Sequence, residues 1–203
     1  MPPTEDIYLY LTGAWRMMTG RPDGLRMLDL SADGFWNSFF AIVVALPALI
    51  VGWVGVANGL GAQPEIFGGR LSILLRVALV DFGAWVLPLV ALAAVARPAG
   101  IGGRFVAYVV SSNWSSALIV WLMLPAALLR LLAPSLQNFA EILSLVLFAI
   151  SMALTWRLTN VAIGKGPAMG TAVFAGMFFA SLVILFMLQG ALGLNIPDQL
   201  PAG

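Results

Sequence analysis

One acidic residue, Asp81, lies about nine residues inside a long hydrophobic stretch that runs from Ile73 to Ala96. With about 1.5 Å of rise per helical residue, its carboxylate is expected roughly 14 Å deep, near the middle of a bilayer. A charge at that depth costs on the order of 2.5–3.5 kcal/mol on insertion scales. We therefore expect Asp81 to face protein or water, to carry a proton, or to have a partner.

A second set of polar side chains lies in the next hydrophobic stretch, where residues 111–116 read SSNWSS. Serine can hydrogen-bond to its own helix, whereas the amide of Asn113 needs a partner elsewhere. Arg157 lies about six residues from the end of a later stretch, where interface anchoring is the ordinary role of a long arginine. The predicted intramembrane polar site is Asp81, Asn113, Ser112, Ser116 and Arg157.

Two interpretations of this set stay open. In the first, Asp81 is a proton or cation site that Asn113 and the hydroxyls orient. In the second, a buried hydrogen bond fixes how the second and third membrane helices meet, contributing about 0.6–2 kcal/mol.

The sequence lacks the residues that most catalytic chemistry requires. The chain has no Cys and no His, and its single lysine, Lys165, lies in the turn GKGP. Neither GxGxxG nor GxxxxGK[ST] occurs, so no phosphate cradle is indicated. We expect a protein that is not an enzyme and has no metal and no cofactor. The net charge of +1 also argues against a nucleic-acid partner.

The composition is typical of a membrane protein. Of 203 residues, 61% are hydrophobic and 9% charged, against about 25% charged in average soluble domains. The apolar runs are continuous, which predicts an all-α polytopic protein with five transmembrane helices. The expected spans are 35–56, 73–96, 105–129, 139–163 and 168–193. They form one bundle, residues 35–193, between an N-terminal region, 1–34, and a short tail, 194–203.

The N-terminal region is expected to hold a short helix over residues 4–19, capped by Thr4. Apolar residues recur in it at helical spacing, yet it is too short and too polar to span. It either lies in the headgroup region as an interfacial helix or packs against the bundle. Residues 20–34 and 58–72 are predicted to be a surface linker and a loop, and Ser31 is predicted to cap the first span.

Small residues recur four apart in two of the spans, Gly55 and Gly59 in the first and Ala172, Gly176 and Ala180 in the fifth. Such spacing lets another helix approach closely. We expect these positions to pack helices, either within the bundle, in a homo-oligomer or against other membrane subunits.

Five spans place the two termini on opposite sides of the membrane. With the N-terminus inside, the inner segments hold seven of the ten basic residues and the outer segments three. This asymmetry favours a cytoplasmic N-terminus and a periplasmic C-terminus. Nine arginines against one lysine are common in GC-rich bacteria, which indicates a bacterial inner (cytoplasmic) membrane.

The fourth-to-fifth junction, WRLTNVAIGKGPAMGTAVFAGMFFASLVI from Trp156 to Ile184, resembles the bacterial branch of the Yip1 family of integral membrane proteins. The resemblance covers roughly residues 10–193 by topology and the fourth and fifth helices by residue pattern. Eukaryotic relatives carry a DLYGP-type motif before the first span, and DLSADGF at 29–35 agrees only at Asp29 and Leu30. The resemblance implies a membrane location, and the eukaryotic role in vesicle traffic does not carry over.

Two functions follow as expectations. The first is a scaffold or accessory subunit that associates through small-residue helix faces. The second is a small transporter or proton-linked permease centred on Asp81.

Overall fold

The computed structural model describes residues 2–60 and 69–194, and this part of the chain is helical throughout, with no strand. Five helical segments are long and apolar enough to cross a membrane, which confirms the predicted fold class. The helices are α1 (Thr4–Met18), η1 (Pro22–Met27), α2 (Ala32–Ser38), α3 (Ala41–Leu60), α4 (Gly69–Ala96), η2 (Gly102–Arg104), α5 (Phe105–Leu132), η3 (Pro134–Leu136), α6 (Gln137–Ile163) and α7 (Pro167–Ala191).

The first span is two helices, α2 and α3, rather than the single helix expected over 35–56. Ser31 caps α2 as predicted, since its hydroxyl accepts a hydrogen bond from the backbone N–H of Gly34 at 3.0 Å. The interruption follows Ser38, whose hydroxyl donates to the carbonyl of Phe35 at 2.7 Å. The next backbone bonds are of the i to i−3 type, which tightens the chain into a turn.

The ends of the long helices follow their local sequence. Gly164 ends α6 in the left-handed region, with φ +60°, and Pro167 begins α7 at a position where no N–H is needed. The predicted loop over 58–72 is wrong at both ends, because α3 runs to Leu60 and α4 begins at Gly69. The rest of that loop, residues 61–68, and the tail from 195 lie outside the described residues.

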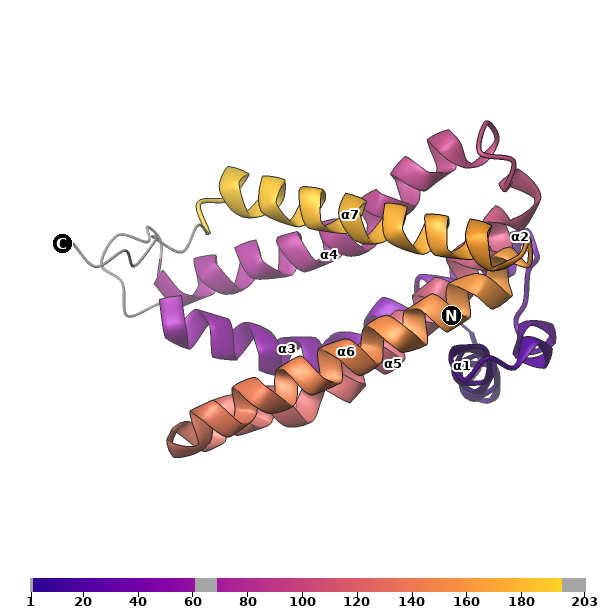
Figure 1. Cartoon of the computed structure of the whole chain (residues 1–203). Helices are drawn as coiled ribbons and strands as arrows, with labels where there is room; N and C mark the ends of the chain where they lie inside the picture. Colours follow the sequence, from indigo (N-terminus) through magenta and orange to yellow (C-terminus); the bar gives the residue numbers. More distant parts are fainter. Residues whose placement is uncertain (1, 61–68, 195–203) are drawn as a thin grey trace.

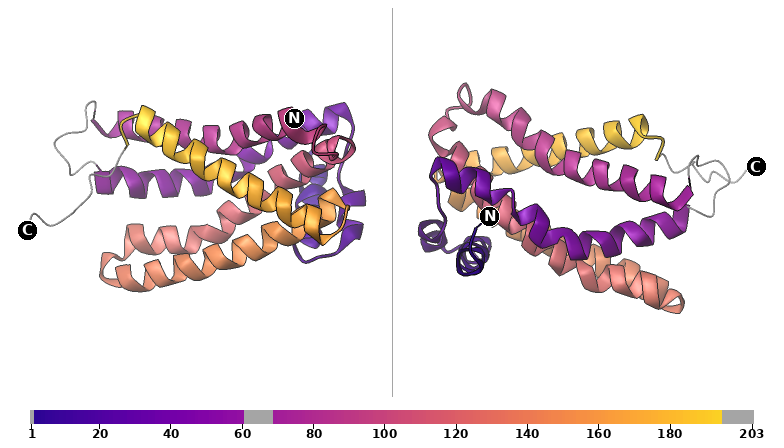
Figure 2. Two further views of the ribbon diagram at one scale, coloured as in Figure 1. Left: turned by 45° about the horizontal axis from the view of Figure 1, so that its top comes forward. Right: turned by 180° about the vertical axis from the view of Figure 1, so that it is seen from behind.

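The helix α5 is the centre of the bundle, with α3 and α6 packed against it (Figure 1). The helix α7 packs against α6 near its beginning and against α4 towards its end, and the views of Figure 2 agree on this crossing. By contrast, α4 touches α5 at few points. The bundle is therefore closed at the end that carries α1 and more open at the opposite end.

The larger buried cluster of the described residues lies at the closed end, where α1 packs against α5 and α6. Met17 and Met18 of α1 are buried there with Trp114 of α5. The ring of Tyr10 lies 5.4 Å from that of Trp114, and burial, helped by nearby carboxylates, raises the pKa of Tyr10 above its ordinary value. The structure contains the predicted packing of this helix against the bundle, and it leaves Tyr8 and Trp15 exposed on the other face of the helix.

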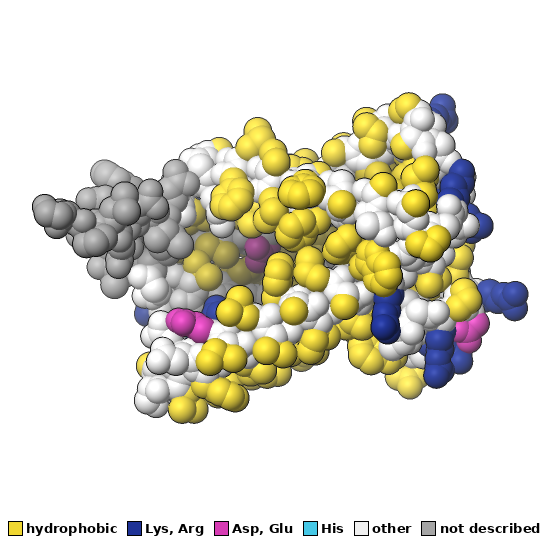
Figure 3. All heavy atoms as spheres, viewed as in Figure 1, with side chains coloured by type: hydrophobic (Ala, Val, Ile, Leu, Met, Phe, Trp, Pro, Cys, Tyr) yellow, Lys and Arg dark blue, Asp and Glu magenta, His cyan; other side chains and the backbone are white. Residues whose placement is uncertain are grey.

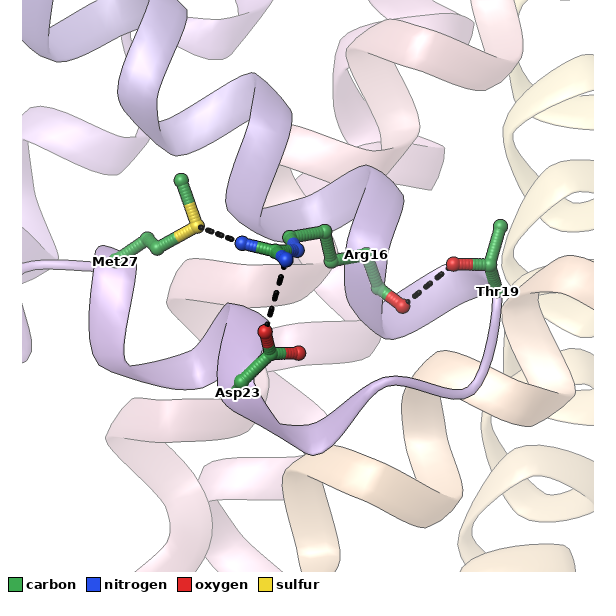
Figure 4. A network of polar contacts seen from close by, with 4 residues as sticks. All are labelled: Arg16, Thr19, Asp23 and Met27. Atoms are coloured by element: carbon green, nitrogen blue, oxygen red, sulfur yellow. Dashed lines mark hydrogen bonds and ion pairs between the residues drawn. The ribbon is translucent and has the colours of Figure 1, made fainter.

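The N-terminal helix begins and continues differently from the sequence prediction. Thr4 lies inside α1 and makes no capping bond, because Pro3 holds the cap position. The predicted linker contains the 3-10 helix η1, which packs on α1. In the network of Figure 4, Arg16 pairs with Asp23 at 3.1 Å and donates to the sulfur of Met27 at 3.8 Å. These contacts fold residues 20–27 back onto α1.

The hairpin of α6 and α7 depends on a close approach at Gly170. A Cβ at this position would lie 2.2 Å from Oδ1 of Asn160, whereas a Cβ at Gly176 on the same helix would meet nothing within 4 Å. We expect Gly170→Ala to lower the free energy of unfolding by about 1–3 kcal/mol through overpacking. Gly176→Ala is the matched control and should not lower it. Thermal unfolding in detergent measures both, and equal stability of the two variants would contradict this packing.

Candidate functional site

The carboxylate of Asp81 is held by a tryptophan from the neighbouring helix. Nε1 of Trp53 on α3 donates to Oδ2 of Asp81 on α4 at 2.6 Å. Trp53 is 9% exposed and also packs edge-on against Phe82, with ring centroids 5.6 Å apart. Within the described residues this is the only hydrogen bond of the Asp81 side chain, which is itself partly exposed. The acid is therefore oriented but retains capacity to bind another group.

Asp81 lines a large cavity, which we call the Asp81 cavity. It has a volume of about 930 Å³ and is lined by residues of α3, α4, α5 and α7. Figure 3 looks into the hollow from the side and shows an acidic side chain at its floor. Its size falls in the range of about 300–1,000 Å³ that is usual for small-molecule sites.

Small residues on α3 make room for the cavity. Gly52, Gly55 and Gly59 line it, and a Cβ added to any of them would meet nothing within 4 Å. The predicted pair Gly55 and Gly59 thus lies on a cavity wall, with no helix of the described chain packed against it. Most of the remaining wall is aliphatic, so the interior is apolar apart from a few groups.

The other polar side chains that line the cavity include Gln189 on α7, and Arg130 and Asn58 near its outer end. Arg130 donates to the hydroxyl of Ser144 at 2.7 Å, and Asn58 accepts from Arg70 at 2.7 Å. Along α3 the cavity extends from Ala48 to Asn58 and beyond, a rise of about 15 Å. It therefore runs from the end of the bundle where α5 finishes to the depth of Asp81.

At the other end the cavity gives way to a hydrogen-bonded cluster, the Asn113 cluster, made of Asn113, Trp85 and Ser38. Nε1 of Trp85 donates to Oδ1 of Asn113 at 2.9 Å, and Nδ2 of Asn113 donates to the hydroxyl of Ser38 at 2.9 Å. Asn113 and Ser38 are fully buried. The cluster joins α2, α4 and α5 across the centre of the bundle.

The structure does not bring the predicted polar residues into one site. Asp81 and Asn113 each have a tryptophan partner and do not bond to one another. Ser112 and Ser116 are partly exposed on α5, and Arg157 is exposed on α6. Within the described residues no ion pair joins Arg157 to Asp81. Asn113 does link the second and third membrane helices, through Trp85 rather than through Asp81.

Sequence reasoning did not select Trp53 or Ser38 as partners. A signal for Trp53 was present, because it is the only side chain with a hydrogen-bond donor between Ala41 and Ala57. A lone acid on an adjacent helix needs such a donor. Ser38 carried no comparable signal, since a serine at a helix end most often bonds to its own backbone.

The small residues of α7 face a separate groove. Ala172, Gly176 and Ala180 line a cavity of about 320 Å³ between α7 and α4. The two helices come close further along, where a Cβ on Gly83 would lie 2.5 Å from Cδ1 of Leu188. The small residues Ala172, Gly176 and Ala180 therefore lie between α7 and α4 but leave an open space between the two helices.

These observations define what the site can do. One oriented carboxylate within an apolar cavity suits a ligand with a positive charge and an apolar body. The described residues include no cluster of three or more acids that could hold a metal ion. An activated nucleophile is not suggested by the side chains that line the cavity.

The Asn113 cluster predicts a stability difference between two buried polar residues. Asn113→Ala leaves the indole N–H of Trp85 without its acceptor, so we expect a loss of about 1–3 kcal/mol. Ser111→Ala is the control, because the Ser111 hydroxyl is also fully buried but bonds only to carbonyls of its own helix. Unfolding in detergent should show a clear loss for the first variant alone, and equal losses would mean that the cluster does not join the helices.

Comparisons with protein-family models, with curated proteins and with solved structures give no match for this chain. The resemblance to bacterial Yip1-like proteins therefore stays a prediction. The described residues contain five helices that are long and apolar enough to span a membrane.

Proposed function

We propose that this protein is a small membrane transporter that binds an amphiphilic cation, or a protonated amine, at Asp81. The observation that carries the proposal is a lone carboxylate at the floor of a cavity of about 930 Å³. A cation with an apolar body would pair with Asp81 and fill the aliphatic space around it. Trp53 would hold the carboxylate in place and offer its ring to the bound cation.

The closed end supports a transport role over simple binding. The cavity is open at the side of the bundle, where Figure 3 looks into it, and the Asn113 cluster lies beyond its inner end. A site that is blocked towards one end of the bundle is what one state of an alternating-access cycle requires. The second state would need the bond between Trp85 and Asn113 to open, and few other contacts between α4 and α5 would oppose that opening.

A scaffold or accessory subunit that associates through small-residue helix faces is the second candidate. Ala172 and Gly176 of α7 are exposed along their groove, which supports contact with another molecule in the membrane. Two of the predicted packing residues, Gly55 and Gly59, line the Asp81 cavity instead. The cavity is therefore the stronger of the two observations.

The proposed setting is a bacterial inner membrane with the closed end on the cytoplasmic side. Lys and Arg side chains gather at the end that carries α1 and the turns before α5 and α7 (Figure 3). Cytoplasmic segments of membrane proteins are enriched in such residues. Labelling the two ends from opposite sides of the membrane tests the orientation.

The proposal predicts that the charge of Asp81 is needed for cation binding. Asp81→Asn keeps an acceptor for Trp53 but removes the charge, so reconstituted protein should bind tetraphenylphosphonium about ten- to a hundredfold more weakly. Glu141→Gln is the control, because Glu141 is exposed on α6 and lies outside the cavity. Equilibrium dialysis gives the affinities, and uptake into proteoliposomes with a pH-sensitive dye reports proton-linked flux.

Two outcomes would contradict transport at Asp81. Equal affinity for the probe in Asp81→Asn and Glu141→Gln would show that the carboxylate does not bind the cation. Absence of any binding or flux in the unmodified protein, together with co-purification of a stoichiometric membrane partner, would favour the scaffold instead. Gly55→Leu should reduce binding as well, since its side chain would enter the open space of the cavity.

A further inference from the structure

The groove between α4 and α7 is a second, separate feature of the membrane-facing surface. Its wall is almost entirely apolar and runs from Pro88 to Val95 on α4 and past Gly176 on α7. At one end it reaches Ala99 and Ile101, in the turn that leads to α5. The groove therefore starts at the basic end of the protein and passes into the apolar part of the bundle.

Two basic side chains lie where the groove meets that turn. Nζ of Lys165 donates to the carbonyl of Gly100, which stands between the lining residues Ala99 and Ile101. Cγ of Arg97 lies 3.4 Å from where a Cβ on Gly102 would be, so this side chain folds along the same turn. Neither cation pairs with a carboxylate among the residues that the structure describes.

We propose that this groove binds one anionic phospholipid, with an acyl chain along α7 and the phosphate at Lys165 and Arg97. The ammonium of Lys165 has three donors and uses one of them on Gly100, so donors remain for a phosphate oxygen. The guanidinium of Arg97 matches phosphate geometry. Basic pockets between membrane helices on the cytoplasmic side bind acidic head groups in this way.

The dimensions of the groove fit a lipid chain better than a protein helix. From Met169 to Ala180, α7 rises about 16 Å, close to half of a hydrocarbon core of about 30 Å. An acyl chain of one leaflet has this reach. A helix from a second copy would be about 10 Å wide and would need a seam across the whole bilayer. The groove stops before α4 and α7 touch at Gly83.

The test compares lipids and variants in the purified full chain. We expect dioleoyl-phosphatidylglycerol to raise the unfolding midpoint in detergent more than dioleoyl-phosphatidylcholine does, and inorganic phosphate to have no such effect. The double variant Lys165→Gln, Arg97→Gln should bind phosphatidylglycerol about 25-fold more weakly, at about fivefold for each basic residue. The control is Arg21→Gln, Arg26→Gln, which removes the same charge from exposed positions on or beside η1.

A further pair of variants tests the apolar part of the groove. Gly176→Leu fits the open space at that position and should weaken the binding of both lipids, whereas Gly55→Leu, in the Asp81 cavity, should not. The single variant Lys165→Gln repeats the head-group arm if the double variant does not fold.

Three results would overturn the proposal. Equal losses in the two double variants would mean that surface charge in general attracts the lipid. An equal effect of inorganic phosphate would mean that the site takes the free anion. A change from oligomer to monomer in Gly176→Leu, with lipid affinity unchanged, would assign the groove to a second copy.

Discussion

The architecture depends on one buried amide that needs several hydrogen bonds where water cannot provide them. Asn113 lies fully buried within α5, and Trp85 and Ser38 satisfy its carbonyl and its amino group. Leaving such a group without partners costs about 1–3 kcal/mol, and lipid offers no alternative partner. The amide therefore holds α4 and the first span at fixed positions on α5, and it divides the bundle into a closed half and an open half.

The open half follows from residues that take little space. Three glycines on α3 leave the wall of the Asp81 cavity without side chains, and Trp53 reaches across to the acid from the same helix. One helix thus supplies both the space and the donor that a buried carboxylate needs. The same reasoning explains the groove beside α7, where Gly176 leaves room that no neighbouring side chain fills. In this bundle, small residues create cavities as well as contacts between helices.

The sequence was sufficient for the class of fold, because continuous apolar runs of about twenty residues determine where the spans lie. It also singled out Asp81 and Asn113 as side chains that must have partners. It could not identify Trp85 as the partner of Asn113, since an indole there reads equally well as a packing or interface residue, whereas Trp53 is the only side-chain donor between Ala41 and Ala57. The break after Ser38 depends on a contact between helices, because the Ser38 hydroxyl accepts a hydrogen bond from Asn113. The spacing of small residues also does not predict cavities, because that spacing predicts a contact between helices wherever small residues recur.

The Asn113 cluster blocks the Asp81 cavity from the closed end of the bundle. The chain has no native cysteine, so a single thiol at Gly55→Cys, on the cavity wall, can be probed with a membrane-impermeant reagent in sealed vesicles of known orientation. Lys165→Cys marks the opposite end. Labelling of the two thiols from opposite sides is the predicted result. Labelling of both thiols from the same side, or protection of the Gly55→Cys thiol from both sides, would contradict the account.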